Sequence, residues 1–183
     1  GIQVNKYFAC EIDKYAIQIA NKNYPGIIQL GDVLGVKGKD LPKIDLLIGG
    51  SPCQDLSFAG KGKGLEGDRS SLFYQYVRLL KECKPKYFLL ENVRMKQEYQ
   101  DIISDLLGVQ PIKINSSLVS AQNRVRLYWT NIPNVTQPED KGIVLKDILE
   151  SNPDQSFNSG HQKSGGKHSN MLNTTYKSQA NTI

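Results

Sequence analysis

Residues 44–54 read Ile44-Asp45-Leu46-Leu47-Ile48-Gly49-Gly50-Ser51-Pro52-Cys53-Gln54, an apolar run that leads into a glycine-rich turn. The apolar run is typical of a strand that is buried on both faces of a parallel sheet. A cysteine just beyond the carboxyl end of such a strand lies where open α/β sheets bind ligands. The two glycines favour a sharp turn, and the proline fixes the backbone before the sulfur. On position alone, an inert apolar cysteine in an ordinary turn fits equally well.

Short apolar strands alternate with helical segments along the rest of the chain. Asp13 is expected to cap a first helix, which ends at Tyr24-Pro25-Gly26, and Lys84-Pro85 is expected to end a second helix. Strands are expected at 7–10, 27–30, 44–48, 87–90 and 125–130, and helices at 13–23, from 70 or 71 to 83, and near 99–107, followed by an apolar segment at 111–119. This alternation predicts βαβ units and a Rossmann-like α/β domain with a parallel sheet, whose last two strands are free to pair as an antiparallel edge.

Length and composition suit one globular domain of cytoplasmic type. The 183 residues are 39% hydrophobic and 22% charged, with no apolar run long enough to span a membrane and no visible signal peptide. Cys10, Cys53 and Cys83 are too few and too scattered for a disulfide framework or a zinc site. The net charge of +5 favours a polyanionic partner, although many other proteins are equally basic.

The composition changes after about Pro133. Residues 151–183 are rich in Ser, Asn, Gln, Gly and Lys and contain little apolar material, so this segment is expected to be loosely ordered. His161 and His168 lie there without a neighbouring Cys or acidic cluster, and solvated histidines are favoured over a metal site. We therefore divide the chain into a core at 1–132 and a second region at 133–183, and expect no metal.

Polar or reactive groups follow four successive predicted strands: Glu11, Asp32, Cys53 and Glu91. A single acid after a strand is usually a cap or turn residue, but four in series make chance placement a poor explanation. The glycine-rich signature for dinucleotide binding is missing, since the glycines at 60–67 belong to the loop after the cysteine. A loop that closes over a substrate, with basic residues that meet phosphates, fits this segment better.

Three motifs, in this order, resemble the core of DNA cytosine-5 methyltransferases: Ser51-Pro52-Cys53-Gln54, Glu91-Asn92-Val93 and Gln122-Asn123-Arg124-Val125-Arg126. Residues 7–13, Gly31-Asp32-Val33 and Arg69-Ser70-Ser71-Leu72-Phe73 are similar to further motifs of the family. The resemblance covers roughly residues 5–132. It implies an incomplete Rossmann-like sheet of the kind that binds S-adenosylmethionine, followed at 133–183 by the start of a target-recognition region.

The resemblance implies S-adenosylmethionine as the methyl donor and double-stranded DNA as the partner. By motif position, Glu11 would bind the ribose, Ile12 and Val33 would sandwich the adenine, Asp32 would contact its edge, and Pro52 and Leu72 would line the same pocket. Cys53 would be the nucleophile, Glu91 the acidic partner of the base, and Arg124 and Arg126 its helpers. Contacts to DNA are expected from Gln54, Ser57, Lys61, Lys63, Arg69 and Gln122.

The implied reaction transfers a methyl group to C5 of a cytosine that is flipped out of the duplex. Cytosine C5 is a poor nucleophile, so a thiolate first adds at C6 to form an enamine-like ring. Nearby cations keep the thiol deprotonated, and an acidic group at N3 and the exocyclic amine stabilises the charge that develops. Such enzymes serve DNA methylation and restriction-modification, which suggests a bacterial or phage source.

The family's opening Asp-Leu-Phe-x-Gly-Gly strand and its closing motifs have no counterpart among these residues. We therefore expect an internal fragment or a truncated product, which a complementing segment or a second copy of the chain would complete. Two other functions stay open: an inactive methyltransferase-like subunit that binds DNA or regulates a partner, and a transfer-RNA cytosine-5 methyltransferase. Cofactor binding, covalent trapping on DNA and transfer to tRNA distinguish these alternatives.

Overall fold

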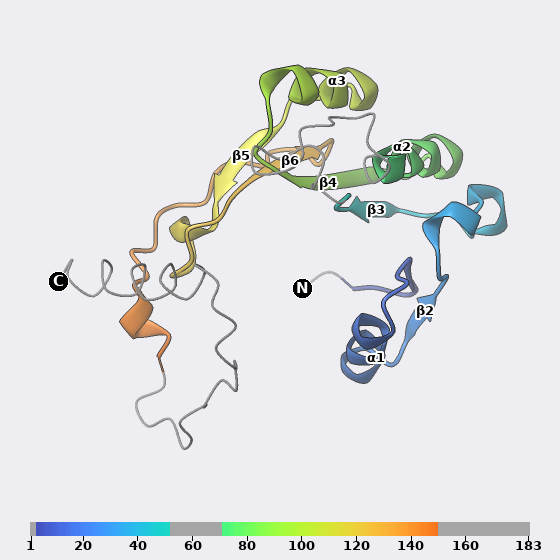
Figure 1. The fold of residues 1–183 in the computed structure, drawn as a ribbon, viewed down its shortest axis with the longest axis horizontal. Helices are drawn as coiled ribbons and strands as arrows, with labels where there is room; N and C mark the ends of the chain where they lie inside the picture. Colours follow the sequence, from blue (N-terminus) through green and yellow to red (C-terminus); the bar gives the residue numbers. More distant parts are fainter. Residues whose placement is uncertain (1–2, 52–70, 150–183) are drawn as a thin grey trace, which may run out of the picture. The chain divides into compact units, whose positions relative to one another are not determined.

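The computed structural model describes residues 3–51 and 71–149, apart from the side chain of Ser71 (Figure 1). The expectations for the loop at 54–68 and for the segment 151–183 lie outside these residues. The elements in chain order are β1 (Tyr7–Ala9), α1 (Lys14–Asn23), β2 (Ile27–Gln29), η1 (Val33–Gly35), η2 (Gly38–Asp40), β3 (Leu46–Gly49), α2 (Ser71–Cys83), β4 (Tyr87–Val93), α3 (Gln97–Leu107), β5 (Ile112–Asn115), η4 (Ser116–Leu118), β6 (Val125–Thr130) and η5 (Leu145–Asp147).

The helix ends follow local sequence signals. Asp13 caps α1, because its Oδ1 accepts hydrogen bonds from the amides of Tyr15 at 2.9 Å and Ala16 at 2.8 Å. The helix stops before Pro25, as predicted. At the end of α2, Lys84 adopts a φ of 45°, a left-handed conformation that a helix cannot continue. Neighbouring residues therefore mark all three of these helix ends.

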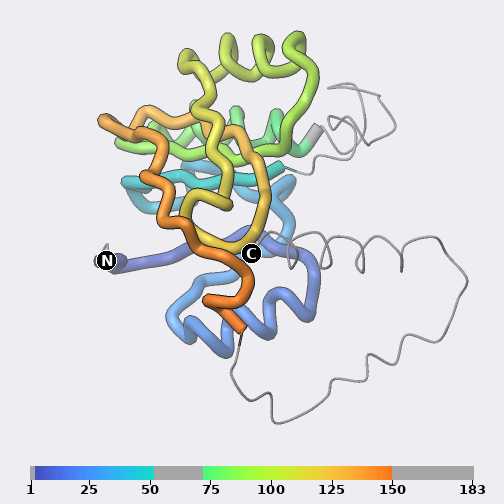
Figure 2. The backbone as a smooth tube through the Cα atoms, turned by 90° about the vertical axis from the view of Figure 1, so that its left-hand side faces the viewer, coloured from blue at the N-terminus to red at the C-terminus, as the bar shows by residue number. Residues whose placement is uncertain are grey.

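The strands form two sheets. β1 and β2 pair in parallel, and a separate four-stranded sheet has the order β3-β4-β6-β5. Within the second sheet β3 and β4 are parallel, whereas β6 runs antiparallel to both β4 and β5. Figure 2 shows β4 between β3 and β6. The predicted α/β class is confirmed, but the sheet is mixed rather than parallel, because the last two strands form the antiparallel edge.

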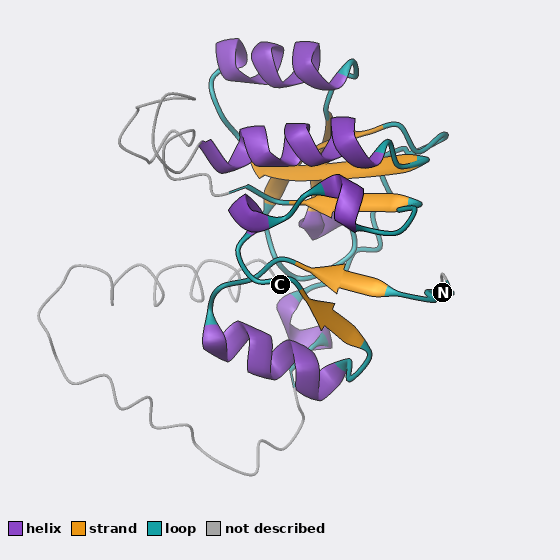
Figure 3. Ribbon diagram, turned by 90° about the vertical axis from the view of Figure 1, so that its right-hand side faces the viewer, coloured by secondary structure: helices purple, strands orange, loops and turns teal. Residues whose placement is uncertain are grey.

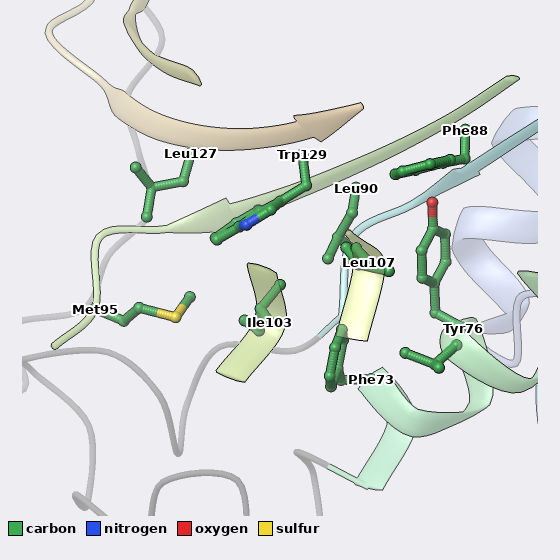
Figure 4. Packing of buried hydrophobic residues seen from close by; sticks show 10 residues of the cluster. Phe73, Tyr76, Phe88, Leu90, Met95, Ile103, Leu107, Leu127 and Trp129 are labelled. Carbon is green, nitrogen blue, oxygen red and sulfur yellow. The ribbon is translucent and has the colours of Figure 1, made fainter. Parts of the chain in front are cut away.

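The hydrophobic core lies between the four-stranded sheet and two helices. Helices α2 and α3 lie on the same side of that sheet (Figures 1 and 3). Trp129 and Leu90 from the strands face Phe73 and Ile103 from the helices (Figure 4), and all four are fully buried. The Trp129 indole donates a hydrogen bond to Ser104 Oγ at 3.0 Å, which satisfies its polar atom inside the core.

Burial alternates along β4, and this assigns its side chains to two faces. Phe88, Leu90 and Asn92 are buried on the face toward the helices, and Glu91 lies on the opposite face. The sequence prediction ended this strand at residue 90 and placed Glu91 beyond it. The prediction was wrong there, because pairing with β6 continues to Val93 opposite Arg126.

The N-terminal β1–α1–β2 segment is built differently. None of the residues in its two strands or its helix is buried. The chain divides into two compact units, one of residues 1–115 and 125–137 and the other of residues 116–124 and 138–183. The boundary after residue 132 that the sequence suggested stays a prediction.

Candidate active site

Two carboxylates follow the adjacent strands β1 and β2. Glu11 Oε1 accepts hydrogen bonds from the amides of Ile12 at 2.8 Å and Asp13 at 2.9 Å. Asp32 Oδ1 accepts from the amide of Leu34 at 2.9 Å and so caps η1. These bonds fix the direction of both carboxyl groups, and each engages only one of the two carboxylate oxygens.

The ends of β1 and β2 lie close together. The strands are in parallel register, and the amide of Leu30 donates to the carbonyl of Ala9 at 2.8 Å. Partial burial raises the pKa of the Cys10 thiol, and the nearby negative charge of Asp32 raises it further. Beside these groups the side chain of Ile12 is 75% exposed, which leaves an apolar surface next to two acids. Val33 is half-buried.

At the carboxyl end of β3, Gly49 and Gly50 lie close to two different side chains. A Cβ at Gly49 would come within 2.5 Å of the Tyr76 ring, and one at Gly50 would lie 3.4 Å from Glu91 Oε2. Neither glycine has a positive φ, and the sharp turn that the sequence suggested stays a prediction because it continues beyond the described residues. Gly49 cannot carry a side chain because a Cβ there would overlap the Tyr76 ring, whereas a Cβ at Gly50 would make only an ordinary van der Waals contact with the Glu91 carboxylate.

Glu91 and Arg126 form an ion pair on the sheet face opposite the helices. The guanidinium Nε lies 2.7 Å from Glu91 Oε1, and the side chains are 37% exposed for Glu91 and 18% for Arg126. Arg126 Nη1 also donates to the carbonyl of Val125 at 2.9 Å, which fixes the guanidinium plane. The pair joins β4 to the antiparallel strand β6, and its partial burial reduces screening by salt. An acid with an arginine partner therefore lies beside Gly50, three residues before Cys53.

A hydrogen bond that the sequence did not predict joins the same two strand ends. Asn92 is 2% exposed, and its Nδ2 donates to Ser51 Oγ at 3.1 Å. Its Oδ1 accepts from the amide of Val93 at 2.8 Å. A polar side chain at a core-facing position of an apolar strand was the available signal, because such a group needs partners. Asn92 therefore ties the residue before Pro52 to β4.

Several predicted site residues lie outside the described part of the chain. Leu72, in the first turn of α2, is described and half-buried. The structure gives no position for the rest: Pro52, Cys53, Gln54, Ser57, Lys61, Lys63 and Arg69. Their predicted roles stay predictions.

Gln122 and Arg124 belong to the second unit, in the segment that joins η4 to β6. Ser116 organises this segment: its Oγ donates to the carbonyl of Gln122, and its amide donates to the carbonyl of Arg124 at 3.1 Å. The amide of Lys141 donates to the carbonyl of Leu118 at 2.8 Å. The side chain of Gln122 is exposed. Glu91 and Arg126, by contrast, both belong to the first unit.

Among residues 3–51 and 71–149 there is no group of three or more His, Cys, Asp or Glu side chains arranged to hold a metal ion. No helix in those ranges has the length and apolar character needed to cross a membrane.

Comparisons with known proteins identify relatives of this chain. A family model for C-5 cytosine-specific DNA methylases matches residues 1–183. The orphan methyltransferase M.SPRI of Bacillus phage SPR is 40% identical over 156 residues, which cover 76% of this chain and 36% of that protein. The type II methyltransferase M1.ScrFI of Lactococcus lactis subsp. cremoris is 36% identical over an alignment of 188 positions, which covers 88% of this chain and 48% of that protein.

A solved structure has the same fold. It is assigned as a DNA modification methyltransferase encoded within a prophage of E. coli, and it superposes with a TM-score of 0.55 at 28% identity. The match covers 68% of this chain and 39% of the other. This chain spans between 32% and 53% of the length of the curated relatives, which come from phages and bacteria. The family match over the whole chain, together with these relatives, shows that the chain belongs to the C-5 cytosine-specific DNA methylase family.

Proposed function

We propose that this chain carries part of the active site of a DNA cytosine-5 methyltransferase, with Cys53 as nucleophile and Glu91 and Arg126 as the groups that hold the base. One observation supports this most directly. The Glu91–Arg126 ion pair lies beside Gly50, and only two residues separate Gly50 from Cys53. An acid and a fixed cation next to a cysteine-bearing turn suit nucleophilic addition to an electron-poor ring.

The separate β1–β2 and β3–β4–β6–β5 sheets suit an incomplete Rossmann-like sheet whose strand ends carry the site. Residues 1–132 would form the partial catalytic core, and residues 133–183 would begin the target-recognition region. Arg124 and Gln122 precede β6; Arg124 would assist at the base and Gln122 would contact the DNA.

The residues after β1 and β2 fit S-adenosylmethionine. Two carboxylates at neighbouring strand ends suit ribose hydroxyls and an adenine amino group, both of which are hydrogen-bond donors. Glu11 would take the ribose and Asp32 the adenine edge. The exposed Ile12 and the half-buried Val33 would contact the faces of the adenine ring, with Pro52 and Leu72 in the same pocket. When bound, S-adenosylmethionine supplies an electrophilic methyl group.

In the first step the Cys53 thiolate adds to C6 of the cytosine. A carbon–sulfur bond forms, and the electrons of the C5–C6 double bond move into the ring toward N3 and O2. Glu91 would share a proton with N3 and accept a hydrogen bond from the exocyclic amine, which stabilises the added charge. Arg126 fixes the orientation of Glu91 through the 2.7 Å ion pair and adds positive potential near the thiolate.

The second step returns the ring to aromaticity. C5 takes the methyl group as the methyl–sulfur bond of the donor breaks and S-adenosylhomocysteine leaves. A base then removes the C5 proton, and the electrons of that bond re-form the C5–C6 double bond and expel Cys53 as a thiolate. The target carbon cannot be reached inside a stacked duplex, so the cytosine must be flipped out. The basic side chains after Cys53 would neutralise phosphates and make DNA binding depend on salt, as would neighbouring polar groups: Lys61, Lys63, Arg69, Gln54 and Ser57.

Covalent trapping on DNA that contains 5-fluorocytosine tests this proposal on the full 183-residue chain. Fluorine at C5 blocks the elimination, so an active enzyme with S-adenosylmethionine forms a stable adduct through Cys53. We expect a mass shift equal to the DNA strand plus one methyl group. The shift should vanish in Cys53→Ala and persist in Cys83→Ala, which removes a different free thiol. An adduct that survives Cys53→Ala would identify another nucleophile.

The alternatives are separated by two further measurements. Titration calorimetry with S-adenosylmethionine and binding to duplex DNA are measured on the same chain. DNA binding with neither cofactor affinity nor adduct would overturn the enzymatic proposal and leave a binding or regulatory role. Methyl transfer to tRNA but not to duplex DNA would instead change the substrate class.

A further inference from the structure

Residues 30–40, between β2 and the loop before β3, carry the proposed adenine contacts. Asp32 and Val33 stand at the start of this segment, which forms the two short turns η1 and η2. The turns lie against α2 (Figures 1 and 3). Helix α2 is the first element that the structure describes after the Cys53 loop. Contacts between α2 and these turns therefore connect the cofactor side of the site to the catalytic side.

Arg78 on α2 reaches the first turn. Its Nη2 donates to the carbonyl of Val33 at 3.2 Å, and its Nε donates to Gln75 Oε1 at 2.9 Å. Its Nη1 lies 3.0 Å from Glu82 Oε1 and 3.1 Å from Oε2, one helical turn further along. All three guanidinium nitrogens are engaged, so the group has a fixed orientation when it bonds the Val33 carbonyl.

Glu82 reaches the second turn from the same helix. Its Oε2 accepts a hydrogen bond from the amide of Gly38 at 2.6 Å. Gly38 is buried, and a Cβ there would come within 2.5 Å of Glu82 Cβ, so the close approach requires glycine. The hydrogen bond from the Gly38 amide lowers the pKa of the Glu82 carboxyl group most, and the hydrogen bond from Arg78 lowers it further. Both keep the acceptor ionised.

We propose that Arg78 and Glu82 form a latch that holds the Asp32–Val33 segment against α2 in the conformation that accepts the adenine ring of the methyl donor. The latch consists of these two side chains, the Val33 carbonyl and the Gly38 amide. Arg78 and Glu82 are positioning residues, because they act on the backbone that carries the contacts. The assignment to adenine rests on the proposed function. Holding the segment before the ligand arrives removes an ordering cost from binding.

The latch makes a prediction that needs no ligand. Amide hydrogen exchange is followed by mass spectrometry with fragmentation, or by NMR, in the full chain. In Arg78→Ala we expect the amides of Gly35, Val36 and Gly38 to exchange at least about tenfold faster, while those of Leu90 and Trp129 stay protected. Lys81→Ala removes an exposed positive charge from the same helix and should change none of these rates. Unchanged exchange across 33–38 in Arg78→Ala would overturn the latch.

Ligand binding tests the positioning role. Calorimetry with S-adenosylmethionine should give a Kd about tenfold higher in Arg78→Ala and about threefold higher in Glu82→Gln, which keeps an acceptor but loses the charge. Arg78→Lys should fall between wild type and Arg78→Ala, and Lys81→Ala should match wild type. Affinity for duplex DNA, measured by fluorescence anisotropy, should not change. Circular dichroism checks that each variant is folded. If Arg78→Ala does not fold, Arg78→Lys takes its place as the test variant.

The outcomes separate this inference from the proposed function. Tight binding by wild type with equal affinity in Arg78→Ala would overturn the latch as a positioning device and leave the proposed function intact. No binding of S-adenosylmethionine by wild type would overturn the assigned ligand, whatever the exchange rates show. A parallel rise in the Kd for DNA would reveal a general structural role and would also overturn the positioning role.

Discussion

The four-stranded sheet and the β1–α1–β2 segment contain similar elements but are stabilised differently. In the sheet, Trp129, Phe73, Leu90 and Ile103 are fully buried between the strands and two helices. In the N-terminal segment no residue of the strands or helix is buried, and Ile12 and Tyr15 are 75% and 64% exposed. Local signals are therefore enough to specify elements, whereas burial decides how strongly those elements are held.

The two halves of the candidate site differ in burial in the same way. The groups proposed for the base, Glu91 and Arg126, stand on strands of the well-packed sheet. The groups proposed for the cofactor, Glu11 and Asp32, follow strands that bury little surface. We infer that the base-holding side is rigid on its own and that the cofactor side depends on the latch and on its ligand for order.

The largest expected effect comes from the core of the sheet. Trp129→Ala should lower the free energy of unfolding by about 3–5 kcal/mol, because it leaves a cavity and removes the indole donor from Ser104 Oγ, which keeps only its bond to the carbonyl of Gln100. Ile19→Ala in α1, where the side chain is 60% exposed, should change it by less than about 0.5 kcal/mol. Urea denaturation measures both. Equal losses would show that α1 packs as firmly as the sheet, and Trp129→Phe provides a milder core variant.

The next largest effect on stability is expected at Asn92 on β4, which bonds Ser51 just beyond the end of β3. Asn92→Ala should cost about 1–3 kcal/mol, since it removes a buried amide and leaves its partners unsatisfied. A double-mutant cycle with Ser51→Ala should give a coupling of about 0.5–1.5 kcal/mol. Alkylation of Cys53 by iodoacetamide, resolved by peptide mapping, should also change in rate. Additive losses in the cycle would show that the hydrogen bond contributes nothing to stability.

A smaller and strictly local effect is expected at the cap of α1. Asp13→Ala should destabilise the helix by about 1 kcal/mol, because two amides lose their acceptor. Faster hydrogen exchange should appear at Tyr15 and Ala16 while the amides of β4 keep their protection. Asp13→Ser, which preserves a capping oxygen, is the matched control. A loss of protection in both regions would mean that the two regions unfold together.

The smallest effect is a pH dependence of the latch. Glu82 has a pKa lowered from its ordinary value of 4.5, so its contribution is present above that pH and is lost as the pH falls through the lower folded value. The amide chemical shift of Gly38, followed by NMR, should titrate with a midpoint below 4.5. In Glu82→Gln the titration should disappear. A midpoint at or above 4.5 would contradict the hydrogen bond as the cause.

Much of the secondary structure was predictable because its signals are local. Asp13, Pro25 and Lys84-Pro85 mark helix ends through neighbouring backbone groups, and β6 was predicted with the bounds that the structure shows. The end of β4 was missed, since the strand continues only because β6 pairs with it as far as Val93. The close approach of the Tyr76 ring to Gly49 was missed, because Tyr76 comes from a distant helix and meets β3 only in the packed structure.

The sequence by itself determined which chemical groups follow the strands, since strand periodicity and turn residues act over a few positions. It also identified the motifs whose family the comparisons then established. Only the tertiary structure decided that Arg126 bonds Glu91, that Asn92 bonds Ser51, and that α2 holds the turns after Asp32. These contacts join residues far apart in the chain, and their partners are set by strand register and helix packing rather than by any local pattern.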